Sequence, residues 1–250
     1  MKADDEHGRK YHMPIQLIAL DMDGTLTQHK TPLEKRNREV LDALSKRYRL
    51  LMVGAGACTR IFRQLGEYPI DVVGNYGMQA GAYDHAQKRL VTLWDVNVPC
   101  DREQTERRVT ALRERFGFEH FAGDNVEYHS SGCITFPILG TKAALADKLA
   151  FDPDRSRRRA IYQQVADAFP EYHVFVGGSS SFDMAPKPYD KRWALEEYCR
   201  RFGIARHEVI FIGDDYGPGG NDESVYHSDF RFLTIDHYTD FPQTAAPLLK

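Results

Sequence analysis

The stretch "LIALDMDGTLT", residues 17–27, places two aspartates directly after an apolar run and just before a glycine. A short apolar run that ends at a turn predicts a buried strand, and buried strands rarely carry unpaired carboxylates. Asp21 and Asp23 therefore indicate a strand whose carboxyl end carries chemistry. Open α/β sheets bind their ligands at that edge.

Apolar strands and helical stretches alternate around this motif, both in the first third of the chain and near its end. In the first expected helix, Thr31 is predicted as the N-cap and Pro32 as the first helical residue. Strands joined to helices by short connections predict an α/β fold, with a Rossmann-like parallel sheet built from residues 15–92 and 189–250. The expected strands are "IQLIAL", "RLLMVG", "DVVG", "EVIFIGDD" and "FRFLTI".

The pattern of predicted helices and strands changes between residues 93 and 188. Two helical stretches, "DREQTERRVTALRERFG" and "PDRSRRRAIYQQVADAF", alternate there with short strand-like runs. We expect an inserted α+β cap domain over the carboxyl edge of the sheet. The arginine-rich run 155–159 is expected to face water, as charge runs on amphipathic helices usually do.

Composition excludes several classes of protein. The net charge is −3 over 33 basic and 36 acidic residues, so nucleic acid and anionic membranes are not expected partners. There is no long apolar run, and residues 1–14 resemble a mobile tail and not a signal peptide. Four scattered cysteines without CxxC spacing favour a reducing, cytoplasmic location. A small molecule is the expected partner, and a homodimer is left open.

Three polar clusters lie near the predicted strand ends. They are Asp21 with Asp23, Lys191, and the segment "GDDYGPGGND" at residues 213–222. Carboxylates from two strand ends form an oxygen-rich site of the kind that Mg²⁺ prefers. A carboxylate can attack phosphorus as a nucleophile, and a second one can exchange protons with the leaving group.

Together, "DMDGTLT", "YDKRWAL" and "GDDYGPGGND" resemble motifs of the haloacid dehalogenase superfamily, in its branch with a large α/β cap (class IIB). Within that branch the chain is most similar to the α-phosphomannomutases. The resemblance implies that Asp21 is the nucleophile and that Asp23 is the general acid/base, with its backbone carbonyl on the metal. It also implies that Lys191 holds Asp21. The implied Mg²⁺ ligands and their supports are Asp21, Asp23, Asp214, Asp215, Asn221 and Asp222.

The sequence departs from the superfamily at its second motif, where a serine or threonine normally ends the second strand. The stretch "LMVGAGACTR" places Ala55 or Gly56 there. Backbone N–H groups of residues 54–57, beginning with Gly54, could bind phosphate instead. The loss of the hydroxyl donor can lower the rate by about 10²-fold.

The cap departs from the phosphomannomutase pattern as well. Where that family binds a second phosphate with arginines, this chain has His129 and Thr141, which cannot bind phosphate bidentately. Ser181 and Asp183 match positions that contact the sugar, and Asn75 matches a position at the edge of the site.

These features favour a magnesium-dependent phosphatase. The expected substrate is a small phosphorylated metabolite such as a sugar phosphate, hydrolysed through an aspartyl-phosphate. One alternative is a phosphomannomutase-like mutase, which needs cationic cap contacts that the sequence does not reveal. The other is a phosphate-binding protein that has lost most of its turnover with the second motif.

Overall fold

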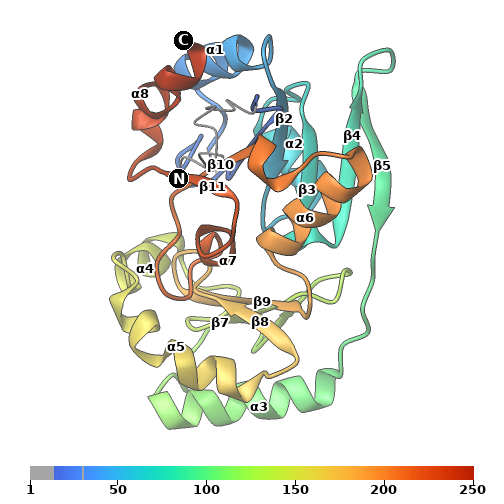
Figure 1. Cartoon of the computed structure of the whole chain (residues 1–250). Coiled ribbons are helices and arrows are strands. Elements are labelled where there is room, and N and C mark those ends of the chain that lie inside the picture. Colours follow the sequence, from blue (N-terminus) through green and yellow to red (C-terminus); the bar gives the residue numbers. More distant parts are fainter. Residues whose placement is uncertain (1–13, 30) are drawn as a thin grey trace, which may run out of the picture.

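A seven-stranded sheet with the order β11-β10-β1-β2-β3-β4-β5 forms the larger of two domains in this computed structural model (Figure 1). The structure describes residues 14–29 and 31–250, so the predicted tail lies outside it except for Pro14. The parallel strands are β1 (Leu17–Leu20), β2 (Arg49–Val53), β3 (Asp71–Gly74), β10 (Val209–Gly213) and β11 (Arg231–Thr234). An antiparallel hairpin, β4 (Gln79–Asp84) and β5 (Arg89–Asp95), extends one edge.

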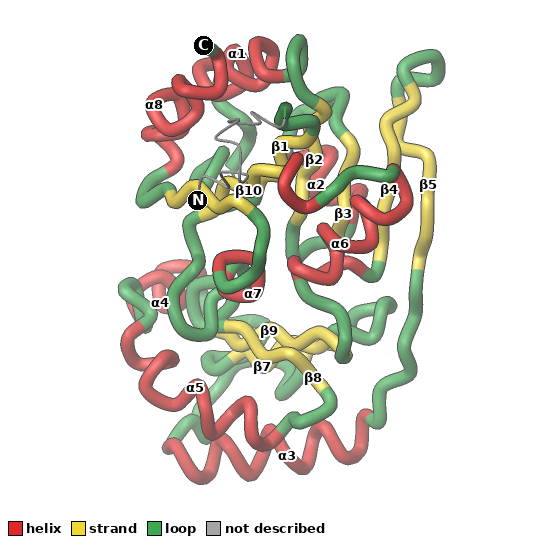
Figure 2. Tube along the Cα trace, in the orientation of Figure 1, coloured by secondary structure: helices red, strands yellow, loops and turns green. Residues whose placement is uncertain are grey.

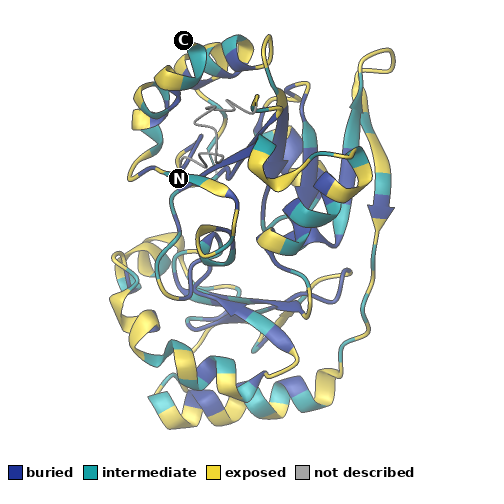
Figure 3. Ribbon diagram, viewed as in Figure 1, coloured by how far each residue is buried: buried dark blue, intermediate teal, exposed yellow. Residues whose placement is uncertain are grey.

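Helices cover both faces of this core sheet, because its strands are apolar on both sides. One face packs against α1 (Lys35–Leu44), α2 (Cys58–Gln64) and α8 (Phe241–Ala245). The other packs against α6 (Lys191–Phe202) and α7 (Glu223–Tyr226). Short 3₁₀ helices are η1 (Asn75–Gly77), η2 (Arg206–Glu208), η3 (Tyr238–Asp240) and η4 (Ala246–Leu249). Figure 3 shows the central strands β1, β2, β3 and β10 largely buried between the helices, whereas the edge strand β5 is mostly exposed or half-buried.

The second domain is an antiparallel sheet with the order β6-β7-β9-β8, and its longer helices lie on the side away from the core. Its strands are β6 (Glu127–Tyr128), β7 (Ile134–Pro137), β8 (Tyr172–Phe175) and β9 (Ser181–Pro186), and its helices are α3 (Arg102–Phe116), α4 (Leu145–Phe151) and α5 (Ser156–Ala168). Loops connect it to the core at both of its ends (Figure 2). The predicted fold, an α/β core with an inserted α+β cap, is confirmed. The predicted boundary at residue 92 falls inside β5.

The cap meets the core at an apolar seam beside the carboxyl ends of the parallel strands. Tyr76 and Met78, which follow β3, pack against Cys133, Phe175 and Ala185 of the cap. The rings of Tyr76 and Phe175 stack with centroids 4.4 Å apart and planes inclined by 7°. This seam holds the cap over the edge of the sheet at which ligands are expected.

The first core helix starts later than predicted. Helix α1 begins at Lys35 with Glu34 at its N-cap position, so the prediction of Thr31 as N-cap is wrong. The Thr31 hydroxyl donates instead to the Gln28 carbonyl at 2.8 Å, and Leu33 N donates to Gln64 O. Contacts with α2 therefore keep this segment out of the helix. Among the described residues, no helix is long and apolar enough to cross a membrane.

Candidate active site

Lys191 joins three polar side chains from two different loops. It is the first residue of α6, which Asp190 caps by accepting a backbone hydrogen bond. Its Nζ lies 2.5 Å from Asp21 Oδ1, 2.6 Å from Asn221 Oδ1 and 2.7 Å from Asp222 Oδ1. Burial alone lowers the pKa of this amine, but Asp21 and Asp222 outweigh burial and raise it above the ordinary value. Lys191 is therefore a fixed positive charge.

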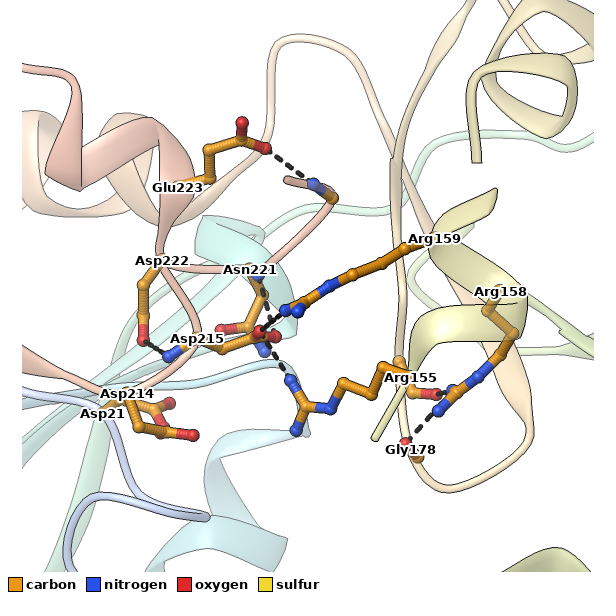
Figure 4. A network of polar contacts seen from close by, with 12 residues as sticks. Asp21, Arg155, Arg158, Arg159, Gly178, Asp214, Asp215, Asn221, Asp222 and Glu223 are labelled. Atoms are coloured by element: carbon orange, nitrogen blue, oxygen red, sulfur yellow. Dashed lines mark hydrogen bonds and ion pairs between the residues drawn. The ribbon is translucent and has the colours of Figure 1, made fainter. Parts of the chain in front are cut away.

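Asp21, Asp214 and Asp222 form a compact group of carboxylates at the ends of β1 and β10 (Figure 4). One oxygen from each lies within 4.8 Å of the others. Burial and repulsion from Asp21 and Asp222 raise the pKa of Asp214 to about 8. Burial also raises the pKa of Asp222 to about 7, with Lys191 opposing the rise and Asp21 adding to it. The group holds more negative charge than Lys191 can neutralise.

The turn after β1 is shaped to bring Asp214 close. Gly24 has a φ of +103°, and a Cβ built on it would lie 2.3 Å from Asp214 Oδ2. Thr25 Oγ1 donates to Asp214 Oδ1 at 3.0 Å. Only glycine allows both this backbone conformation and this approach, which explains the Asp-Gly-Thr sequence.

The carboxylate group is a suitable site for Mg²⁺. Its donors are all oxygens, which this hard cation prefers. When all three carboxylates are ionised, the lysine leaves two negative charges in excess, equal to the charge of one Mg²⁺ ion. Burial and neighbouring carboxylates raise the pKa values of Asp214 and Asp222, and a bound cation would relieve the repulsion between these carboxylates.

Asp23 and Asp21 have different side-chain partners. Gln64 Nε2 donates to Asp23 Oδ1 at 2.7 Å, while Arg60 Nη2 and His29 Nδ1 both lie 3.9 Å from its Oδ2. The Asp23 side chain is also more exposed than that of Asp21, at 19% against 8%. The two aspartates of the motif therefore have separate environments, as separate chemical roles require.

The second-motif loop offers backbone donors and no hydroxyl. Among contacts between described residues, the N–H groups of Ala55, Gly56 and Ala57 have no hydrogen-bond partner, whereas Gly54 N donates to Val73 O. The loop packs closely against Asn75, whose N donates to Gly56 O at 2.8 Å. The free N–H groups of this loop are therefore its available anion donors.

Asp215 lies outside the carboxylate group, although it was expected to support the metal. It pairs with two arginines of the cap, with Arg155 Nη1 at 2.5 Å and Arg159 Nη2 at 3.4 Å from its Oδ1 (Figure 4). Its other oxygen accepts from Asn221 N at 3.2 Å. Asp215 therefore connects the core to the cap.

The arginine run 155–159 does not simply face water, so that prediction is wrong. Arg155 and Arg159 reach the core, and the Arg158 side chain is 1% exposed. Arg158 Nε donates to Asp152 at 2.8 Å, and its Nη1 donates to the Gly177 carbonyl at 2.5 Å. Arg158 therefore has a structural role, whereas Arg155 and Arg159 are cap cations at the site.

The predicted sugar contacts lie on the cap sheet and beside the seam. Asp183 Oδ1 accepts from Thr135 Oγ1 at 3.0 Å, and its Oδ2 accepts from Tyr76 Oη at 3.4 Å. Ser181 Oγ donates to the Gly177 carbonyl at 3.1 Å. Burial and Asp183 raise the pKa of Tyr76 well above its ordinary value, so its hydroxyl is a donor.

The two cap positions for which the resemblance implied arginines make local contacts here. His129 Nε2 lies 3.1 Å from Thr135 Oγ1, and Thr141 Oγ1 donates to Asp124 Oδ2 at 3.0 Å. Neither side chain carries a fixed positive charge. The sequence did not single out Arg155 and Arg159, because it gives no sign that Asp215 lies within their reach.

Comparison with known proteins identifies the relatives of this fold and site. A sequence model of the family described as eukaryotic phosphomannomutase matches residues 37–249. Phosphomannomutase from Saccharomyces cerevisiae is 25% identical over 245 residues, covering 94% of this chain and 93% of the relative. Phosphomannomutase 1 from Mus musculus is 23% identical over 240 residues, covering 91% and 88%.

Solved structures share the fold at lower identity. An IMP-nucleotidase from Plasmodium falciparum aligns with a TM-score of 0.67 and 11% identity, covering 96% of this chain and 69% of that chain. A protein from Thermoplasma acidophilum aligns with a TM-score of 0.55 and 14% identity, covering 92% and 89%. These similarities place the chain in the haloacid dehalogenase fold.

The comparisons overturn the main functional prediction. A phosphatase was expected, but the matched family and the curated relatives are phosphomannomutases, which are mutases and not hydrolases. The expectation of hydrolysis depended on the absence of cap cations, and Arg155 and Arg159 remove that argument. The prediction of an enzyme with a phosphomannomutase-like core is confirmed.

Proposed function

Because this chain belongs to the eukaryotic phosphomannomutase family, we propose that it is a phosphosugar mutase. It would move a phosphoryl group between two hydroxyls of a hexose phosphate, and the names of its relatives make mannose phosphate the first substrate to test. The observation that carries this proposal is the pair of cap arginines, Arg155 and Arg159, that reach Asp215 in the loop after β10. A mutase must hold two phosphates in one site, whereas a hydrolase needs to hold only one.

Arg155 and Arg159 have the properties of a second phosphate site. Both extend from the cap toward the carboxylates of the core (Figure 4). Two guanidinium groups on one Asp215 carboxylate leave one positive charge in excess, and each side chain is about one third exposed. Guanidinium groups bind phosphate through paired N–H donors. The distal phosphate of the sugar would replace Asp215 as the partner of the two arginines.

Asp21 would attack the phosphorus atom through Oδ2, because Lys191 already holds Oδ1. The bond between Asp21 and phosphorus forms as the bond from phosphorus to the sugar oxygen breaks, and Asp23 gives its proton to that oxygen. In the second half-reaction another sugar hydroxyl attacks the phosphorus atom, the bond between Asp21 and phosphorus breaks, and Asp23 takes up the proton of that hydroxyl. Gln64 holds Asp23 in place for both transfers.

Asp21, Asp214 and Asp222 would hold the Mg²⁺ ion, which would offset the negative charge of the phosphoryl group. The cap would contribute by excluding water. The Tyr76–Phe175 stack and its apolar neighbours, which pack against Ala55 of the second-motif loop, would close one side of the site, so that a sugar hydroxyl is favoured over water as the acceptor.

The test is an isomerisation assay in which mannose 1-phosphate is converted to mannose 6-phosphate with Mg²⁺ and a catalytic amount of hexose bisphosphate. We expect the wild-type protein to isomerise the sugar. Each of Arg155→Ala and Arg159→Ala should lower kcat/KM by about 10- to 100-fold, since a hydrogen bond to a charged group contributes about 1.5–3 kcal/mol.

Arg157→Ala is the matched control, because Arg157 lies on the same helix and makes its hydrogen bond within the cap, to the Phe151 carbonyl. It should retain nearly full activity. If the wild-type protein isomerises no hexose phosphate, the proposed function is wrong. If the Arg155 and Arg159 variants behave like the Arg157 variant, the cap arginines are not the second phosphate site.

A further inference from the structure

The guanidinium group of Arg60 fills the space that a side chain at Gly56 would occupy. A Cβ built on Gly56 would lie 2.3 Å from Nε and 2.4 Å from Nη2 of Arg60. Gly56 is one of the two positions at which the second motif would carry its serine or threonine. Arg60 therefore takes the place that a side chain at this position would occupy.

Gln64 fixes Arg60 in this position. Arg60 Nη1 donates to Gln64 Oε1 at 2.9 Å, while Gln64 Nε2 donates to Asp23 Oδ1 at 2.7 Å. The second arginine nitrogen, Nη2, lies 3.9 Å from Asp23 Oδ2. One glutamine thus holds the cation beside the carboxylate that the proposed mechanism uses to transfer protons.

Arg60 has donors to spare and lies next to the nucleophile's loop. Its side chain is 44% exposed, and Gln64 accepts only one of the five guanidinium N–H bonds. Strands β1 and β2 are parallel neighbours in which Leu20 pairs with Met52, so the loop after β2 lies beside Asp21. The unpartnered N–H groups of residues 55–57 belong to the same loop.

We propose that Arg60 binds the transferring phosphoryl group beside Asp21, in place of the second-motif hydroxyl. Glycine at position 56 leaves the guanidinium group this space, which a larger side chain would take from it. A guanidinium group offers several charged donors to phosphoryl oxygens, where a hydroxyl offers one neutral donor. The inference rests on the proposed function, since it names a residue for the phosphoryl group that this function transfers.

The test measures binding of inorganic phosphate by calorimetry in the presence of Mg²⁺, which requires no sugar turnover. We expect Arg60→Ala to weaken phosphate binding about 10- to 100-fold, because one charged donor group is lost. Arg63→Ala, on the exposed side of the same helix, should bind phosphate like the wild type.

A double-mutant cycle separates this role from a structural one. In the Arg60→Ala background, Gly56→Ser has room for its hydroxyl and should recover at least about threefold of the lost affinity. In the wild-type background the same substitution displaces the arginine and should not improve binding. The inference is overturned if the wild type binds no phosphate, if Arg60→Ala binds as tightly as Arg63→Ala, or if Gly56→Ser acts equally in both backgrounds.

The phosphate measurement distinguishes this inference from the proposed function. If phosphate binding follows the expected pattern but no hexose phosphate is isomerised, the role of Arg60 stands and the mutase proposal fails. If the wild type isomerises mannose phosphate while Arg60→Ala binds phosphate normally, only the inference about Arg60 fails.

Discussion

At the scale of single residues, Lys191 is the side chain on which the site depends most. It is fully buried and is the common partner of Asp21, Asn221 and Asp222. A buried charge with well-placed partners of opposite charge is tolerated. Removal of the lysine would leave its buried carboxylate partners uncompensated. Lys191 should therefore matter to both stability and catalysis.

We expect Lys191→Met to destabilise the metal-free protein by about 3 kcal/mol or more and to lower activity at least about 10²-fold. Urea unfolding and the isomerisation assay measure the two effects. Lys35→Met is the control, because the Lys35 side chain is 91% exposed and its pair with Glu39 contributes little. An unchanged free energy of unfolding in the Lys191 variant would contradict the role of Lys191 as the charge that compensates the buried carboxylates.

The same scale shows what the sequence could predict of the site. Asp21, Asp214 and Asp222 come together as expected, because β1 and β10 are parallel neighbours that end at the same edge. Asp215 does not join them, since successive residues at the end of an extended strand point in opposite directions. Asp214 is directed to the carboxylate group and Asp215 to the cap.

At the scale of elements, α5 shows why its arginines were misjudged. A run of positive charge on a helix predicts a face in water when no partner is known. Here Arg155 and Arg159, four residues apart, lie on the side that meets the core loop. Arg158 is directed into the cap, where Asp152 neutralises it. Partners this specific become visible only once the cap is placed on the core.

Other elements differ from prediction where tertiary contacts outweigh local signals. The Thr31-Pro32 pair has the chemistry of a helix start, but contacts with α2 delay α1 to Lys35. The hairpin of β4 and β5 was not predicted as part of the sheet. Strand β5 is mostly exposed or half-buried at the edge, so its apolar pattern is weak.

At the scale of the whole molecule, the order of strands and helices was sufficient to predict an α/β core with an inserted cap. Regular alternation of apolar strands and amphipathic helices leaves few other folds. The sequence could not predict how the cap contacts the core. That contact depends on the Tyr76–Phe175 stack and on the salt bridges of Asp215, which join residues about 60 to 100 positions apart.

The charge of the site should make stability depend on pH and on Mg²⁺. The pKa values of Asp214 and Asp222 are raised to about 8 and about 7, first by burial. A carboxyl with a higher pKa in the folded than in the unfolded state stabilises the fold only while it is protonated. In chelator, the free energy of unfolding should therefore fall as pH rises through this range.

Mg²⁺ should oppose this loss, because a ligand that binds only the folded state stabilises it. Thermal unfolding measured from about pH 6 to pH 9, with chelator and with Mg²⁺, compares the two conditions. We expect Tm to fall more steeply with chelator. Asp214→Asn, which removes one of the titrating groups, should flatten the chelator profile. Identical profiles with and without Mg²⁺ would contradict a metal site at these carboxylates.

The measurement that tests the central claim most directly follows a labelled phosphoryl group. The protein is incubated with Mg²⁺, unlabelled mannose 1-phosphate and a hexose bisphosphate that carries a radiolabelled phosphoryl group. We expect the label to pass through Asp21 into hexose monophosphate, with little inorganic phosphate, and Asp21→Asn to abolish transfer. If most of the label is released as inorganic phosphate, or if transfer survives Asp21→Asn, the protein is not a mutase that works through Asp21.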